Sequence, residues 1–130
     1  MRNFLTRYEL RFSTADMIIP VPLHATRMRE RGYNQAELLA ERAADILGKP
    51  LQNGLLVRHR YTPRQSELGQ KERLNNIANA FSIKSRLQIQ GKSVILVDDL
   101  LTTGATASSA AGALKAAGAS KVTLLTLSIA

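Results

Sequence analysis

The chain has 130 residues and a formal net charge of +8, and 45% of its residues are apolar while only 5% are aromatic. This length fits one domain, and the apolar fraction is typical of a globular protein and not of a disordered one. The chain has no cysteine, which excludes disulfides and thiolate metal sites. The positive charge suits an anionic partner such as phosphate, pyrophosphate or nucleic acid, or serves solubility alone.

Residues 1–16 carry the weakest signals, and they contain no apolar run of the signal-peptide type. No stretch of the chain approaches the roughly 20 apolar residues that span a bilayer. We therefore expect a cytoplasmic protein without membrane insertion. We expect a single domain over residues 1–130, in which residues 1–16 are an N-terminal extension or a partial hood.

Apolar runs and stop signals predict the first elements. Residues 17–22, MIIPVP, predict a short strand bounded by prolines. A loop rich in arginine follows, and Asn34 is a suitable cap for a helix that Gly48 and Pro50 end. Residues 51–57 predict a second strand that contains a glycine.

The middle of the chain is more polar. Residues 58–69 predict a basic loop, residues 71–79 a short helix and residues 80–83 a short strand. Residues 86–92 predict a connector that ends in a turn at Gly91-Lys92.

The C-terminal part carries the clearest pattern. Residues 93–97 include four consecutive aliphatic side chains, which predicts a strand buried on both faces, as in a parallel sheet. Residues 106–117 predict a helix that Gly118 ends, and residues 122–129 predict the last strand. Strand, helix and strand in this order form a βαβ unit. The sequence thus predicts an α/β fold with a mostly parallel sheet flanked by helices.

Two acidic residues, Asp98 and Asp99, follow the predicted central strand. Ligands of open α/β sheets bind at the carboxyl ends of the strands, where ribose hydroxyls or a hydrated Mg²⁺ would suit two carboxylates. After Leu100 and Leu101, residues 102–106 are small or hydroxylated and stand at a helix start, which suits a phosphate group. A capped helix after a surface turn is the alternative. The Walker A and G-x-G-x-x-G patterns are absent, which disfavours P-loop NTPases and Rossmann enzymes.

Residues 94–106, VILVDDLLTTGAT, resemble the phosphoribosyl pyrophosphate (PRPP) signature of type I phosphoribosyltransferases. Residues 20–35, PVPLHATRMRERGYNQ, and residues 64–81, RQSELGQKERLNNIANAF, resemble two further motifs of the ComF family, which includes GntX-like proteins. The resemblance implies a type I phosphoribosyltransferase-like fold.

The resemblance also implies roles for individual residues. Asp98 and Asp99 would be the catalytic pair that holds the ribose hydroxyls, and Mg²⁺ would bind with PRPP and involve this pair. The 5-phosphate would lie against Thr102, Thr103, Gly104, Ala105 and Thr106. Residues 58–69 would form a mobile loop that closes over the pyrophosphate. The pyrophosphate would lie near Leu23, His24 and Ala25.

Basic and amide side chains in the two loops suit phosphate oxygens, and solvated surface charge is the alternative for each of them. The candidates are Arg27, Arg64, Gln65, Lys71 and Arg73. ComF-like proteins usually carry an N-terminal cysteine-rich zinc segment. This chain lacks such a segment, so we expect no zinc and interpret the chain as a truncated form, a fragment or a short homologue.

Several functions fit these features. The first is Mg²⁺-dependent transfer of a phosphoribosyl group from PRPP, or from another phosphoribosyl compound, to an unknown acceptor. The alternatives are a non-catalytic PRPP sensor and a competence factor that binds single-stranded DNA, because the family resemblance implies a role in DNA uptake. Few aromatic side chains are available for base stacking in the basic loops. A scaffold that binds no phosphate, contacts with competence proteins and a homodimer also remain open.

Overall fold

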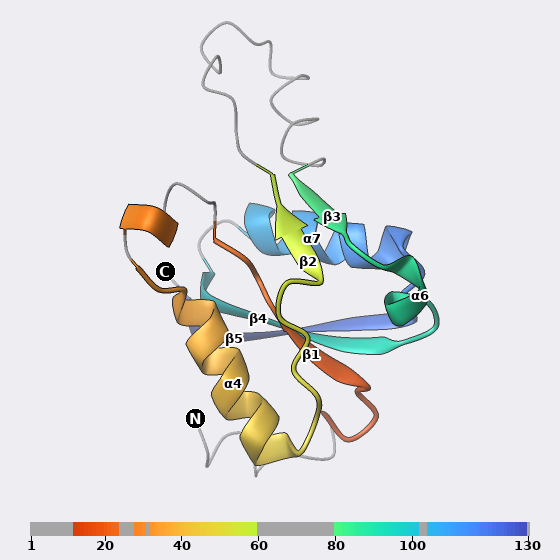
Figure 1. The fold of residues 1–130 in the computed structure, drawn as a ribbon. Coiled ribbons are helices and arrows are strands. Elements are labelled where there is room, and N and C mark those ends of the chain that lie inside the picture. The colour runs from red at the N-terminus through yellow and green to blue at the C-terminus, as the bar shows by residue number, and fades with distance from the viewer. Residues whose placement is uncertain (1–11, 24–27, 31, 60–79, 102–103, 130) are drawn as a thin grey trace, which may run out of the picture.

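A computed structural model describes residues 12–23, 28–30, 32–59, 80–101 and 104–129 (Figure 1). The helix predicted over residues 71–79 lies outside these ranges. Within them, no helix is both long enough and apolar enough to cross a membrane.

A three-stranded parallel sheet forms the centre of the molecule. Its strands are β1 (Met17–Pro20), β4 (Ser93–Leu101) and β5 (Lys121–Ile129), in the spatial order β1-β4-β5. The aliphatic run of β4 occupies the middle, and Val94 to Val97 are each at most 1% exposed. This burial confirms the predicted strand that is covered on both faces.

Strand β4 continues beyond the predicted end at Val97. Strand β1 pairs with β4 only from Met17 opposite Val94 to Pro20 opposite Val97. Strand β5 extends the pairing, with Asp98 opposite Thr126. The prediction that the acidic pair follows the strand is therefore wrong, because pairing with β5 extends β4 through the acidic pair to Leu101.

Helices cover both faces of the sheet, as predicted (Figure 1). Helix α4 (Gln35–Leu47) packs on β1 and β4, and its buried alanines join a core cluster with Ile95 and Val97. Helix α7 (Ala105–Ala116) covers the opposite face, where Leu114 lies in a second cluster with Val94 and Leu96. The alternation of side chains along β4 thus divides the core into two layers.

A two-stranded antiparallel hairpin, β2 (Leu56–Arg58) and β3 (Phe81–Ile83), lies on the α7 side. The strand predicted over residues 51–57 is only partly correct. Leu51 forms an isolated parallel bridge with Ile18, and β2 begins five residues later. Between them Gly54 has a φ of +89°, which interrupts the extended backbone.

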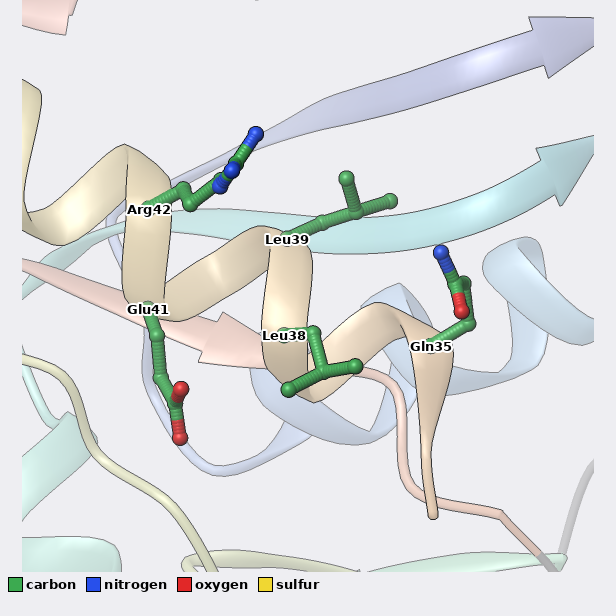
Figure 2. Close-up of a pocket in the computed structure, with 5 residues that line it drawn as sticks. All are labelled: Gln35, Leu38, Leu39, Glu41 and Arg42. Atoms are coloured by element: carbon green, nitrogen blue, oxygen red, sulfur yellow. The ribbon is translucent and has the colours of Figure 1, made fainter. Parts of the chain in front are cut away.

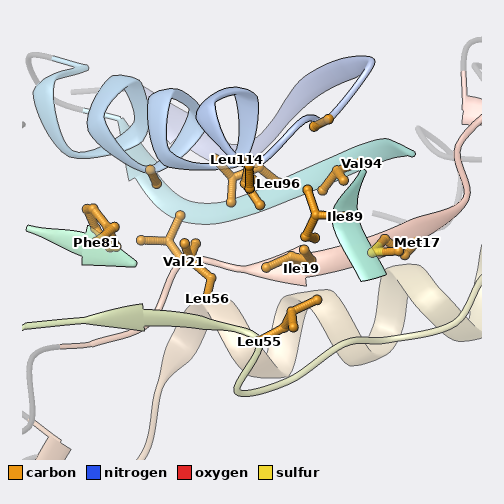
Figure 3. Close-up of a cluster of buried hydrophobic side chains, with 13 residues drawn as sticks. Met17, Ile19, Val21, Leu55, Leu56, Phe81, Ile89, Val94, Leu96 and Leu114 are labelled. Carbon is orange, nitrogen blue, oxygen red and sulfur yellow. The ribbon is translucent and has the colours of Figure 1, made fainter. Parts of the chain in front are cut away.

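A single helical turn, α6 (Arg86–Ile89), replaces the connector predicted over residues 86–92. Its last residue, Ile89, is fully buried in the cluster shared with the hairpin and α7. Figure 3 shows this cluster between α7 and the hairpin. Burial of one side chain therefore stabilises a helix that is too short to form on its own. The predicted turn follows at Gly91, which has a φ of +74°.

Candidate functional site

The start of α4 is fixed to the carboxyl edge of the sheet by one buried side chain. The Nδ2 of Asn34 donates a hydrogen bond to the carbonyl of Val21, just after β1, at 3.2 Å. Its Oδ1 accepts a hydrogen bond from the backbone N–H of Ala36 at 3.1 Å. Asn34 is thus the predicted helix cap. Its hydrogen bond to Val21 fixes the start of the helix relative to β1.

The start of α7 lies a few residues beyond the acidic pair. Gly104 is the N-cap, with a φ of +82°, and its carbonyl accepts the N–H of Ser108 at 2.8 Å. Glycine adopts this conformation without strain, but it has no side-chain oxygen with which to cap the helix. Ala105 is exposed and Thr106 is half-buried. Backbone N–H groups and the helix dipole at such a start favour an anion.

The acidic pair lies within β4 next to these helix starts. Asp98 and Asp99 are both half-buried, and the N–H of Asp99 donates to Oδ1 of Asp98 at 2.9 Å. Strand alternation places Asp98 on the α7 face of the sheet, the face of Val94 and Leu96. Desolvation by burial is the main cause that raises the pKa of Asp98 from 3.8 to about 6.

Neighbouring charges modify this shift in both directions. The side-chain hydrogen bond and the negative charge of Asp99 raise the pKa of Asp98 further. The backbone N–H of Asp99 and the positive charge of Arg58 lower it. The carboxylate is thus placed where ionisation is costly, and hydroxyl donors or a cation would stabilise it.

Arg58 is a residue whose place the sequence did not predict correctly. It was expected at the start of the basic loop, but it is the last residue of β2 and is half-buried. Its Cζ lies 5.5 Å from the centroid of the Phe81 ring, and Phe81 is its partner across the hairpin. The sequence shows only a basic residue after an apolar pair, and it contains no signal for this pairing.

The structure describes only part of the predicted site. Leu23 is half-buried, shortly after β1. Leu23, the acidic pair and residues 104–106 are thus on described segments near the carboxyl ends of β1 and β4. The other predicted residues lie outside the described ranges: His24, Ala25, Arg27, Arg64, Gln65, Lys71, Arg73, Thr102 and Thr103.

A metal could find only part of its ligand set in the described segments. These contain no group of three or more histidine, cysteine, aspartate or glutamate side chains that could hold an ion. Asp98 and Asp99 offer two adjacent carboxylates. Such a pair fits Mg²⁺, which usually takes one or two carboxylates and keeps water and substrate phosphate oxygens as its other ligands.

A separate pocket lies along α4 (Figure 2). It has a volume of about 370 Å³. Its lining side chains all come from one helix and include Leu38, which is 48% exposed. Neither Asp98 nor Asp99 lines it, so it is distinct from the site at the carboxyl edge. The lining residues are Gln35, Leu38, Leu39, Glu41 and Arg42.

Residues 34–128 match the phosphoribosyl transferase domain, and the chain therefore belongs to this family. The names of its relatives confirm the predicted resemblance to the ComF branch. The chain is 42% identical to competence protein F of Haemophilus influenzae over 92 residues, which are 70% of this chain and 40% of the relative. It is 39% identical to competence protein ComFC of Bacillus subtilis, over 84% of this chain and 44% of the relative.

A third relative is the DNA utilization protein YhgH of Escherichia coli K12, which is 36% identical over 82% of this chain and 46% of its own length. The chain thus spans less than half of the length of these relatives.

Solved structures confirm the fold. A purine phosphoribosyltransferase from Pyrococcus horikoshii superposes with a TM-score of 0.58 at 21% identity, over 98% of this chain and 69% of that one. The glutamine PRPP amidotransferase from B. subtilis, complexed with ADP and GMP, superposes with a TM-score of 0.60 at 26% identity. The match covers 96% of this chain and 25% of that one. The predicted type I phosphoribosyltransferase-like architecture is therefore correct.

Proposed function

We propose that the carboxyl edge of the sheet binds PRPP or a related phosphoribosyl compound. One observation carries this proposal: β4 presents two half-buried carboxylates shortly before a helix that begins at a glycine. Asp98 and Asp99 would accept hydrogen bonds from the ribose hydroxyls. The backbone at residues 104–106 would hold the 5-phosphate, since helix starts bind anions.

We propose further that the protein transfers the phosphoribosyl group to an acceptor. The C1–oxygen bond to pyrophosphate would break and a bond to the acceptor would form. The acidic pair would orient the ribose ring, and the basic loop residues predicted from the sequence would stabilise the departing pyrophosphate. Mg²⁺, when bound with PRPP, would neutralise part of the pyrophosphate charge.

The binding proposal is tested by thermal unfolding with PRPP and Mg²⁺. We expect PRPP to raise the melting temperature of the wild-type protein, since a ligand that binds only the folded state stabilises it. The double variant Asp98→Asn, Asp99→Asn should lose this shift. Asp45→Asn, which removes an exposed carboxylate from α4, is the matched control. Absence of a shift in the wild-type protein at millimolar PRPP would overturn the proposal.

Transfer and sensing make different predictions once binding is established. A transferase releases pyrophosphate in the presence of its acceptor, whereas a sensor binds PRPP and leaves it intact. Pyrophosphate release across a panel of nucleobases and amines therefore separates the two. Release that depends on both an acceptor and the acidic pair supports transfer. Binding without release from any acceptor supports the sensor.

A role in DNA utilisation is the second proposal, and the names of the relatives favour it. The cytoplasm as the place of this role is an expectation from the sequence. The net charge of +8 is compatible with contact with single-stranded DNA. Binding should then weaken steeply with added salt, as phosphate contacts release counterions. A flat salt dependence would instead favour an indirect role through competence proteins. Light scattering in the same buffers would establish whether the chain forms a homodimer.

A further inference from the structure

The β2–β3 hairpin is anchored at the same edge of the sheet as the acidic pair. Phe81 is 7% exposed and belongs to the core cluster that contains Val21 and Leu96. Figure 3 shows Phe81 close to Val21, at the opposite end of β1 from Met17. Because Val21 follows the last residue of β1, the Phe81 end of the hairpin lies at the carboxyl edge.

This anchoring places a positive charge on the face of β4 that carries Asp98. Arg58 is the register partner of Phe81, and its Cζ lies 5.5 Å from the centre of the ring. Stacking on an aromatic face holds a guanidinium in a defined orientation. Asp98 is two residues beyond Leu96 and shares its face of the strand. The small lowering of the pKa of Asp98 by the charge of Arg58 agrees with this placement.

We propose that Arg58 is a specificity-determining residue that serves as the counter-ion of Asp98 and must be displaced before a ligand hydroxyl reaches this carboxylate. The inference rests on the proposed function only for the identity of the ligand. The guanidinium of Arg58 stacks on the ring of Phe81, and the burial of Phe81 fixes its position.

This arrangement makes Arg58 selective for ligands that carry an anion beside the ribose hydroxyls. Neutral hydroxyls that bind Asp98 would separate this carboxylate from the half-buried guanidinium of Arg58. Arg58 would then have no negative charge as a partner. A ligand with an anionic group near C1 would offer Arg58 a new partner. Ribose 5-phosphate should therefore bind less tightly than PRPP, because it offers Arg58 no anionic group near C1.

Ligand affinities of three variants test this selectivity. In Arg58→Gln, the ratio of the ribose 5-phosphate Kd to the PRPP Kd, measured with Mg²⁺, should fall by about tenfold, the equivalent of one charged hydrogen bond. Arg58→Lys keeps the charge and should retain part of the ratio. Arg86→Gln, an exposed arginine on α6, should leave it unchanged. Equal weakening of both ligands, or an unchanged ratio in Arg58→Gln, would overturn the proposal.

A second measurement tests the contact without any ligand. Urea unfolding of Arg58→Gln, Asp98→Asn and the double variant forms a double-mutant cycle. We expect the effects on the unfolding equilibrium constant to deviate from independence by about threefold or more. Independence would overturn the counter-ion role. If the wild-type protein binds neither ligand, the proposed function fails, while the cycle still determines whether Arg58 and Asp98 are paired.

Discussion

Replacing Asp98 with asparagine should make the folded protein more stable at neutral pH, although it removes a residue of the candidate site. Burial is the main cause that raises the pKa of Asp98 to about 6, so its ionisation opposes folding. Asparagine keeps the side-chain shape and an oxygen that can accept the N–H of Asp99. The attraction of Arg58 offsets only part of the cost, because it is the smallest of the effects on this pKa.

The sign and size of this stability change follow from the difference in proton binding between the folded and unfolded states. The folded pKa of about 6 lies above the unfolded value of 3.8, so the folded state binds more protons between about pH 4 and pH 6. The free energy of unfolding of the wild-type protein therefore falls as the pH rises through this window. A rise of about two in pKa corresponds to about 3 kcal/mol. Solvent screening of a half-exposed carboxyl group reduces the expected effect to about 1–2 kcal/mol.

Urea denaturation at pH 4, 5, 6 and 7 measures this effect. The stability advantage of Asp98→Asn should be small at pH 4 and reach about 1–2 kcal/mol at pH 7. Asp45→Asn is the control, and its exposed position should limit its effect to about 0.5 kcal/mol. If Asp98→Asn is less stable than the wild-type protein at pH 7, or if its advantage is equal at pH 4 and pH 7, ionisation of Asp98 does not oppose folding.

Three further predictions follow from the described segments. Asn34→Ala removes the cap of α4 and should lower the free energy of urea unfolding by about 1–2 kcal/mol, whereas a loss below a few tenths would contradict the capping role. Gly112→Ala, in open space on α7, should stabilise the folded protein by about 0.5–1 kcal/mol. Gly118→Ala should destabilise it by about 1–3 kcal/mol, because φ is +102° and the new Cβ would lie 3.2 Å from Gln90. Equal melting temperatures of the two variants would disprove this contrast. PRPP affinity, measured by calorimetry, should rise between pH 5 and pH 7 as Asp98 ionises, whereas an affinity that falls or stays constant over this range would contradict a role for the ionised carboxylate.

The C-terminal half could be predicted from the sequence because its signals are local and strong. Four consecutive aliphatic residues predict a strand buried on both faces, and the structure confirms this for Val94 to Val97. The predicted boundaries of α7 and β5 differ from the observed ones by a single residue at their first positions. The extension of β4 to Leu101 could not be predicted, because it depends on pairing with β5 and not on hydrophobicity.

The middle of the chain was harder because its short elements depend on distant contacts. Helix α6 has four residues, and its buried Ile89 contributes to a core that includes Leu96 and Leu114. No local pattern predicts such a helix. The pairing of Arg58 with Phe81 is equally non-local, since 22 residues separate the two strands that carry them. The acidic pair was therefore predicted and its counter-ion was not.

The position of Asp98 is itself an argument for function. Val94 and Leu96 precede it on the same face of β4, and both are completely buried. A third apolar side chain at position 98 would continue this face without the cost of burying a carboxyl group. The fold instead places an acid there, raises its pKa, and brings a stacked arginine from another part of the chain towards it. Positions where local rules fail and a second element compensates are typical of binding sites. Because Asp98→Asn is expected to gain stability and lose ligand binding, the two measurements together separate a residue kept for function from one kept for folding.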